Sequence, residues 1–247
     1  MTHRPGVRVL FEPSARAGAD LAGATAVVID AIRATTTVVA ALAAGCREVI
    51  PCRTEAEVRA EAAGRPAGSV VTAGERGGVR IEGLDLNNSP SVMTADRVGG
   101  RTLLLTTTNG TQAILDAMSA QTVLVAATAN RSAVARRAAA LGRPVVFVPA
   151  GTVGAVSCED TLVAGAVIEA MADAPGGAAF DLDDSARVAL AAWRGVAADI
   201  GRVFRQTAGG AVIVGLGLDA DLAVCAQVDT TDLVPVVRGD PPVISAR

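Results

Sequence analysis

Side chains that can bind anions or metal ions gather at four places along this chain of 247 residues. The clusters span Asp30–Thr37, Gly74–Gly78, Thr106–Thr111 and Ala150–Asp160, and each directly follows a short apolar run typical of a β-strand. Arginine, threonine and the backbone N–H groups of glycine-rich turns bind phosphate-like anions. Carboxylates beside such an anion usually need a cation between them. Together the clusters predict a site for a small, multiply charged anion.

Donors to this anion are expected from side chains and from helix N-termini. Arg33 and Arg76 offer planar pairs of N–H groups that match phosphate or sulfonate. Helices predicted to begin near Thr35 and Thr111 would point free backbone N–H groups at the same anion. Further contacts are predicted from Thr36, Thr107, Thr108, Asn109, Gly110, Thr111, Gly151 and Thr152.

Four carboxylates lie among these cationic groups, namely Asp30, Glu75, Glu159 and Asp160. The only histidine is His3, so a histidine-rich zinc site is excluded, and oxygen ligands favour a hard ion such as Mg²⁺. We expect Asp30, with Glu75 or Asp160, to hold the ion. Glu159 or Asp160 could then activate a water molecule as a general base.

Each feature also has a purely structural explanation, and the sequence leaves both open. Asp30 could cap the next helix, and the Glu159–Asp160 pair suits the first turn of a helix. Arg33 could be an exposed helix residue, and Glu75–Arg76 a surface ion pair. The Thr106–Thr111 segment could be only a turn with its capping residues.

Composition and missing motifs exclude several classes of function. The net charge of −3 and the 2% aromatic content argue against nucleic-acid binding. All 22 basic residues are arginine, so no lysine can form a Schiff base. No G-x-x-x-x-G-K is present, no G-x-G-x-x-G follows a strand, and no cysteine has an arginine six residues later. Asp181–Asp183 has the D-x-D pattern of haloacid dehalogenases, but it follows a Gly/Ala stretch rather than a buried strand.

Cysteine spacing and the distribution of apolar residues indicate where the protein is found and whether it binds a membrane. The four cysteines fit neither a C-x-x-C metal site nor a disulfide scaffold, so we expect buried free thiols. Met1–Leu10 shows no signal peptide, and no stretch has 18 uninterrupted apolar residues. We therefore expect a soluble cytoplasmic protein that binds no membrane. A homodimer is one candidate state, for which the sequence holds no direct signal.

The elements that would position the polar clusters alternate along the chain. Strands are predicted at Val7–Phe11, Ala26–Asp30, Glu48–Pro51, Ser69–Ala73, Thr102–Thr106, Thr122–Ala126 and Pro144–Pro149. Helices are predicted at Thr35–Ala44, Thr54–Ala63, Thr111–Met118, Arg131–Leu141 and Cys158–Ala172. This alternation predicts an α/β fold with three α/β/α layers and a mostly parallel sheet. Ligands of such sheets bind at the carboxyl ends of strands, so all four clusters should share one edge.

The remaining segments carry weaker signals. We expect a glycine-rich loop over Gly74–Pro90, a linker or lobe boundary at Ala174–Asp184, and a helix over Ser185–Phe204 that glycine interrupts in its middle. The tail Ala211–Val237 should hold one or two short helices and a last strand at 233–237, and residues 238–247 should be loosely held. We treat residues 1–247 as one domain, with two lobes as the alternative.

Several of these segments together resemble the 2-phosphosulfolactate phosphatases of the coenzyme M route. The matching segments are Val27–Thr37, Gly74–Gly83, Leu86–Pro90, Leu105–Thr111, Ala150–Thr152, Glu159–Gly165, Asp221–Asp229 and Val234–Pro235. The resemblance covers most of the chain in order. It implies Mg²⁺-dependent hydrolysis of a phosphate ester on a sulfonated lactate or a related 2-hydroxy acid. The matching segment Leu86–Pro90 adds Asn88 and Ser89 as expected substrate contacts. We further expect Arg33 and Arg76 to stabilise the charge that develops in the transition state.

One departure from the family pattern bears on activity. We expect Ser-x-His-Gly before the tail, and the chain instead reads Thr207-Ala-Gly-Gly210. Two other function classes therefore stay open, a catalytically silent protein that binds small anions and a phosphotransferase. Direct attack of water on phosphorus and an aspartyl-phosphate at Asp30 are the two candidate mechanisms.

Overall fold

The structure is a computed structural model that describes residues 4–16, 18–173 and 180–246. Within these residues the strands are β1 (Gly6–Val9), β2 (Thr25–Ile29), β3 (Glu48–Pro51), β4 (Val70–Arg76), β5 (Val79–Arg80), β6 (Thr102–Thr106), β7 (Thr122–Ala126), β8 (Val145–Pro149), β9 (Asp181–Leu182), β10 (Val236–Arg238) and β11 (Val243–Ser245). The α-helices are α1 (Ala34–Ala43), α2 (Glu55–Ala63), α3 (Ala95–Val98), α4 (Gly110–Asp116), α5 (Arg131–Leu141), α6 (Cys158–Ala172), α7 (Asp184–Val196), α8 (Ile200–Gln206), α9 (Ala208–Gly215) and α10 (Asp219–Cys225). Most predicted elements are confirmed to within a residue or two.

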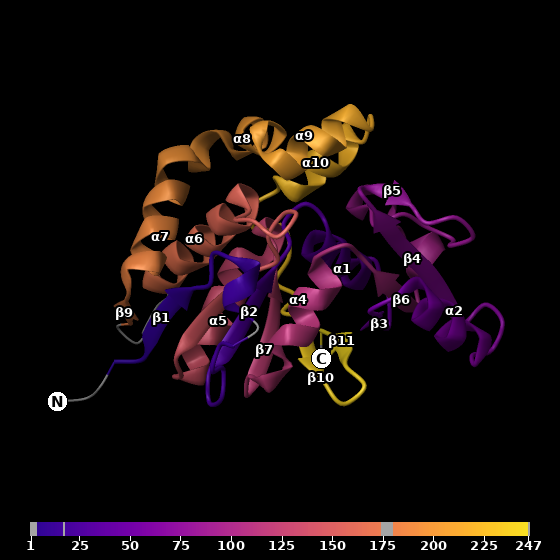
Figure 1. Ribbon diagram of the computed structural model, residues 1–247, viewed down its shortest axis with the longest axis horizontal. Coiled ribbons are helices and arrows are strands. Elements are labelled where there is room, and N and C mark those ends of the chain that lie inside the picture. The colour runs from indigo at the N-terminus through magenta and orange to yellow at the C-terminus, as the bar shows by residue number, and fades with distance from the viewer. Residues whose placement is uncertain (1–3, 17, 174–179, 247) are drawn as a thin grey trace.

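All strands join one sheet in the order β5-β4-β6-β3-β11-β10-β7-β2-β8-β1-β9. Two groups of parallel strands, β4-β6-β3 and β7-β2-β8-β1-β9, are joined by the antiparallel hairpin β10-β11. Helices cover both faces of the sheet (Figure 1). The predicted α/β class with three layers and a mostly parallel sheet is confirmed.

The core consists mainly of small aliphatic residues on both faces of the sheet. Every residue of β2 is buried, and consecutive side chains along the strand point to opposite faces of the sheet. Val28 packs in the cluster that includes residues of α1 and α4, whereas Val27 packs with residues of α5, α6 and α7. A sheet buried on both faces explains why β2 has a continuous apolar sequence rather than an alternating one.

The central hairpin reverses the direction of the strands. Because β10 is antiparallel to β7 and β11 is antiparallel to β3, the two parallel groups run in opposite senses through the sheet. The expectation that all four polar clusters share one edge is therefore wrong. Each group has its own carboxyl edge, yet residues that follow β2, β4, β6 and β8 line one pocket.

The structure corrects two other expectations. The segment from Gly74 is not a loop at its start, because β4 runs on to Arg76 and forms a hairpin with β5. The described residues 238–246 are not loosely held, since β11 pairs with β3 and β10 and buries Ile244 completely. The interruption expected within the helix Ser185–Phe204 is confirmed, because the helix breaks after Val196, next to Gly195, into α7 and α8.

The predicted linker at 174–184 falls partly outside the described residues, as does His3. Of the rest, Asp181–Leu182 forms β9 beside β1, and Asp183 caps α7 by accepting from the Ala186 N–H. The D-x-D pattern therefore has a local structural explanation, because Asp181 belongs to a short strand and Asp183 is the cap of a helix.

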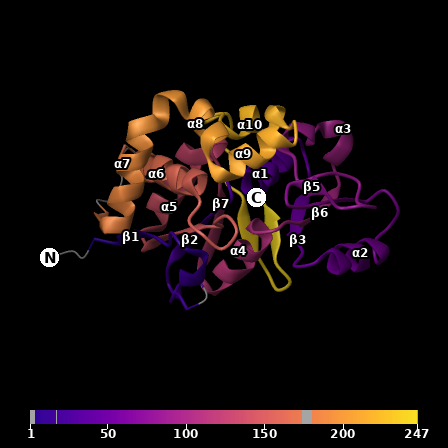
Figure 2. The same ribbon diagram turned by 45° about the horizontal axis from the view of Figure 1, so that its top comes forward.

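Helices α8, α9 and α10 lie across the top of the molecule in both views, between the two parallel groups (Figures 1 and 2). Within the described residues, no helix has the length and apolar character needed to cross a membrane.

Candidate active site

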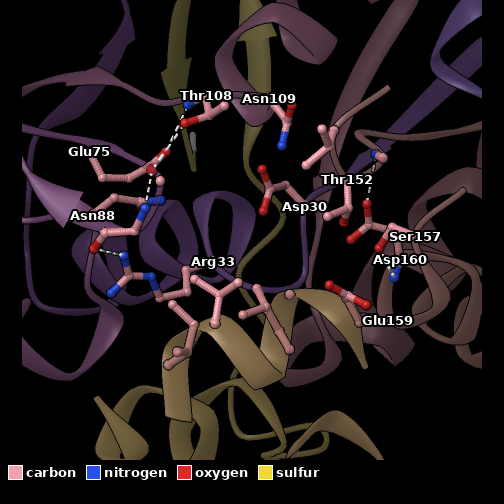
Figure 3. Close-up of a pocket in the computed structure, with 18 residues that line it drawn as sticks. Asp30, Arg33, Glu75, Asn88, Thr108, Asn109, Thr152, Ser157, Glu159 and Asp160 are labelled. Atoms are coloured by element: carbon pink, nitrogen blue, oxygen red, sulfur yellow. Dashed lines mark hydrogen bonds between the residues drawn. The ribbon is translucent and has the colours of Figure 1, made fainter. Parts of the chain in front are cut away.

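A pocket of about 140 Å³ opens where β2, β4, β6 and β8 end. Its walls include Glu75 and Thr108 from one parallel group and Asp30 and Asp160 from the other (Figure 3). Helix α9 contributes Gly209, Val212 and Ile213. Ten predicted site residues line it: Asp30, Arg33, Glu75, Asn88, Thr108, Asn109, Gly151, Thr152, Glu159 and Asp160. The sequence clusters therefore meet in space, although they belong to two oppositely running groups of strands.

Asp30 lies at the end of β2 and at the start of α1. Its Oδ1 accepts a hydrogen bond of 3.0 Å from the Ala34 N–H, so it satisfies the first backbone N–H of α1, as the structural explanation predicts, although the N-cap residue itself is Arg33. Its Oδ2 lies against Gly110, where an added Cβ would be 2.6 Å away. Gly110 is thus needed for close approach, which brings the N-terminus of α4 against the carboxylate.

Glu159 and Asp160 lie in the first turn of α6, which Ser157 caps. Asp160 accepts backbone N–H bonds from Ala31 at 2.8 Å and Gly151 at 3.1 Å, and so ties β2 to the loop after β8. Glu159 is 2% exposed, and within the described part of the chain its Oε2 has no hydrogen-bond partner. A buried carboxylate oxygen without a donor is costly unless a ligand satisfies it.

Glu75, at the end of β4, is held by donors on both oxygens. Its Oε1 accepts from the Thr108 N–H at 2.7 Å, and its Oε2 accepts from the Gly78 N–H at 2.7 Å and the Thr108 hydroxyl at 3.1 Å. These bonds fix the loop after β6 against the β4–β5 turn.

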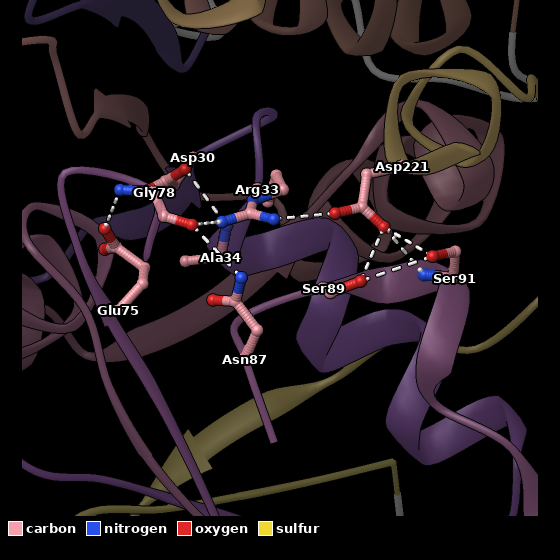
Figure 4. A network of polar contacts seen from close by, with 9 residues as sticks. All are labelled: Asp30, Arg33, Ala34, Glu75, Gly78, Asn87, Ser89, Ser91 and Asp221. Atoms are coloured by element: carbon pink, nitrogen blue, oxygen red, sulfur yellow. Dashed lines mark hydrogen bonds and ion pairs between the residues drawn. The ribbon is translucent and has the colours of Figure 1, made fainter. Parts of the chain in front are cut away.

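Arg33 lines the pocket as a buried side chain, not as the exposed helix residue of the alternative. Its Nη1 forms an ion pair of 2.6 Å with Asp221 of α10, and its Nη2 donates to the Gly78 carbonyl at 2.9 Å (Figure 4). A guanidinium carries five N–H donors, so donors remain for an anion in the pocket.

Arg76 does not reach the pocket. It is exposed and donates to the Glu75 carbonyl and the Thr106 hydroxyl. Neighbouring residues of a strand point to opposite faces, so Glu75 and Arg76 of β4 cannot both face the ligand. The alternative Glu75–Arg76 ion pair is also absent from the described contacts.

Several hydroxyl side chains that were predicted to contact the anion form hydrogen bonds within the protein instead. Thr36 donates to the Ala31 carbonyl, and Thr107 and Thr111 bond to each other across the start of α4. Ser89 donates to Asp221. The turn-and-cap explanation therefore holds for part of the Thr106–Thr111 segment, while Thr108 and Asn109 line the pocket.

The site contains residues that the sequence analysis did not single out. Asp221 and Ser91 belong to the network around Arg33, and Gly209 lies against Glu159. The departure from the family pattern at 207–210 is therefore at the pocket: Thr207 caps α9, and Gly209 lines the cavity. Asp221 begins the segment Asp221–Asp229, which resembles the family pattern. This resemblance is the one sequence signal that marks Asp221 as a candidate site residue.

Burial and neighbouring carboxylates raise the pKa of two residues of the pocket, Asp30 and Asp160. Burial is the main cause that raises the pKa of Asp30 to about 7. The hydrogen bond from the Ala34 N–H lowers this pKa, whereas the nearby Glu75 and Glu159 carboxylates raise it further. Burial and the neighbouring Asp30 and Glu159 carboxylates raise the pKa of Asp160 well above its usual range. The pocket thus concentrates negative charge that a cation would stabilise.

We expect the metal-free protein to lose stability as pH rises from about 4 to 7. Asp30 has a raised folded-state pKa, so in this window the folded protein holds a proton that the unfolded chain has released. A folded-state pKa of about 7 against an ordinary value of 3.8 is worth roughly 4 kcal/mol. Urea unfolding with EDTA from pH 4.5 to 7.5 measures the slope, which Asp30→Asn should reduce and the exposed Glu82→Gln should keep. An unchanged slope in Asp30→Asn would contradict the assignment.

Comparison with known proteins places these features in a family. The sequence model of the family described as 2-phosphosulpholactate phosphatase matches residues 11–240. The chain is 41% identical over 215 residues to a protein of Synechococcus sp. (strain RCC307), covering 85% of this chain and 87% of that protein. A Deinococcus radiodurans protein is 41% identical over 221 residues (87% and 88%), and one from Symbiobacterium thermophilum 40% over 219 residues (88% and 92%). All three are named probable 2-phosphosulfolactate phosphatase. The resemblance seen in the sequence motifs is thereby confirmed, and the chain belongs to the 2-phosphosulfolactate phosphatase family.

Proposed function

We propose that this protein is a Mg²⁺-dependent phosphatase that hydrolyses 2-phosphosulfolactate to sulfolactate and inorganic phosphate. The observation that carries the proposal is the pocket itself, where a buried arginine faces several buried carboxylates. Such a pocket offers donors for a phosphate and oxygen ligands for a cation in the same space. The names of the relatives supply the substrate.

The donor set fits a magnesium ion. Within the described residues, no three histidine, cysteine or acidic side chains are grouped closely enough to form a ready-made metal cage. Magnesium does not need one, because it keeps several waters and takes one or two carboxylates together with substrate oxygens. Asp30, with Glu75 or Asp160, would hold the ion. Bound there, it would neutralise phosphoryl oxygens and lower the barrier to attack.

Arg33 and Asn109 are the side chains best placed to hold the phosphate. Arg33 is fixed by Asp221 and Gly78 and lines the pocket, so its remaining N–H groups can bind phosphoryl oxygens without further ordering. The amide of Asn109 points into the pocket toward Asp30 (Figure 3). Donors held in advance stabilise charge that develops in the transition state.

Glu159 is the residue that we assign as general base. Asp160 uses both carboxylate oxygens on backbone N–H groups, whereas Glu159 Oε2 is unpartnered among the described residues. Glu159 would take a proton from water as the water oxygen bonds to phosphorus. The bond from phosphorus to the ester oxygen breaks, and the alkoxide of sulfolactate takes a proton from solvent.

An aspartyl-phosphate at Asp30 is the competing mechanism, because Asp30 Oδ2 borders the pocket. The two mechanisms differ in the stereochemistry at phosphorus, because an aspartyl-phosphate needs two in-line displacements and direct attack of water needs one. A substrate made chiral at phosphorus should give phosphate with retained configuration if Asp30 is phosphorylated, and with inverted configuration if water attacks directly.

Phosphate release tests the function. We expect release from racemic 2-phosphosulfolactate that depends on Mg²⁺, is lost with EDTA, and exceeds release from phospholactate and phosphoglycolate. The alternative is a catalytically silent protein that binds small anions. It would be supported if the folded protein released phosphate from none of these esters but was stabilised by added phosphate. Release that rises only when an acceptor alcohol is added would support a phosphotransferase.

A further inference from the structure

The guanidinium of Arg33 is held by a carboxylate from a distant part of the chain. Nη1 of Arg33 lies 2.6 Å from Oδ2 of Asp221, and 188 positions separate the two residues. Both side chains are buried, Arg33 at 3% and Asp221 at 1% exposure. Arg33 lines the pocket, whereas Asp221 lies behind it in α10.

The carboxylate of Asp221 is itself fixed on its other side. Its Oδ1 accepts from the hydroxyls of Ser89 and Ser91, each at 2.6 Å, and from the Ser91 N–H at 3.3 Å (Figure 4). The oxygen facing Arg33 is therefore held in one position. The carbonyl of Gly78 fixes the second terminal nitrogen of Arg33 at 2.9 Å. Two acceptors thus set the plane of the guanidinium.

A buried guanidinium needs such partners. Removing an arginine from water is unfavourable unless a nearby carboxylate and further hydrogen bonds satisfy it. A charged hydrogen bond to a fixed carboxylate also has a defined direction. With one N–H of each terminal nitrogen so engaged, the remaining N–H groups are presented in a single orientation.

We propose that Asp221 is a positioning residue that orients Arg33 toward the phosphoryl group, although Asp221 does not touch the ligand. This inference rests on the proposed function for its kinetic readout. It makes the docking of α10 on the Ser89–Ser91 segment part of the active site. The orientation of the Arg33 guanidinium, which binds the anion, then depends on both parallel groups of strands and on the helices above them.

A double-mutant cycle tests the proposal. Asp221→Asn should lower kcat/KM by about 10- to 30-fold, because the amide keeps an acceptor but not the charge. Asp219→Asn is the matched control on the same helix, since Asp219 is half-exposed and pairs with Arg205 at 2.5 Å. In the Arg33→Met background, Asp221→Asn should cause no further loss. A full additional loss in that background would overturn the positioning role.

A milder variant keeps the test valid if Asp221→Asn does not fold. The double change Ser89→Ala with Ser91→Ala frees Oδ1 but leaves the ion pair, so it should cost a few-fold in kcat/KM, again only when Arg33 is present. Loss that persists in Arg33→Met would contradict the proposal.

Binding of inorganic phosphate separates this inference from the proposed function. Calorimetry should show phosphate affinity about tenfold weaker in Asp221→Asn than in wild type or Asp219→Asn. If wild type hydrolyses no ester but shows this difference, only the proposed function fails. If Asp221→Asn binds phosphate as tightly as wild type does, the positioning role is wrong.

Discussion

Replacing Asp30 by asparagine should lower kcat/KM for 2-phosphosulfolactate by about a thousandfold or more. Asp30 lies between the two walls of the pocket, with one oxygen on α1 and the other against Gly110. In either mechanism it is central, as the proposed metal ligand or as the nucleophile. Loss of a carboxylate that holds a catalytic cation removes several kcal/mol of transition-state stabilisation, and each 1.36 kcal/mol is tenfold in rate. Steady-state phosphate release at saturating Mg²⁺ measures the effect.

Stability provides the control for this variant. Asparagine can keep the acceptor for the Ala34 N–H and removes a carboxylate whose pKa burial raises to about 7. We therefore expect Asp30→Asn to fold, and above pH 7 to be more stable than the metal-free wild type. Glu82→Gln, on the exposed surface, should keep full activity. More than a tenth of wild-type activity in Asp30→Asn would rule out a central role for this carboxylate.

Local sequence signals account for most of the fold. Strands β2, β6, β7 and β8 are short continuous apolar runs that the sheet buries on both faces. Polar clusters at their ends mark where the chain leaves the sheet, and for this reason Asp30, Thr108 and Glu159 could be found from the sequence. The carboxyl-end rule accounts for the meeting of clusters within each group of strands, but not for the meeting of the two groups in one pocket.

Long-range pairing carries no comparable signal. The β10–β11 hairpin consists of two strands of three residues, and its insertion between β3 and β7 is decided by tertiary packing. The same limit applies to Asp221, whose partner Arg33 is 188 positions away. A sequence pattern shows which residues are chemically suitable, but not which of them meet.

Side-chain direction is the second source of error. Arg76 has the right chemistry and stands next to Glu75, but both belong to β4, where neighbours point to opposite faces. The alternation applies because the segment that starts at Gly74 continues β4 and is not the loop that its glycine content predicts. Thr107 and Thr111 show a related ambiguity, since the hydroxyls that suit an anion also suit the start of a helix.

Gly209→Ala should lower kcat/KM by about a hundredfold without unfolding the protein. A Cβ at position 209 would lie 2.1 Å from Oε1 of Glu159, so the carboxylate would have to move back by about 1 Å or more. Glu159 is the proposed general base, and a misplacement of about 1 Å at a reacting group can cost about 10²-fold. Because Glu159 is the end of a flexible side chain, the clash can be relieved by its rotation, and the helix itself should persist.

Gly215→Ala is the matched control, because it makes the same change in the same helix. No atom lies within 4 Å of a Cβ built at Gly215, so this variant should keep activity. Alanine also stabilises a helix by up to about 1 kcal/mol relative to glycine, so neither variant should melt much earlier than wild type. Equal activity in Gly209→Ala and Gly215→Ala would show that the position of Glu159 does not limit the reaction. A loss confined to Gly209→Ala, mainly in kcat, would instead tie the rate to that carboxylate and to the glycine that leaves room for it.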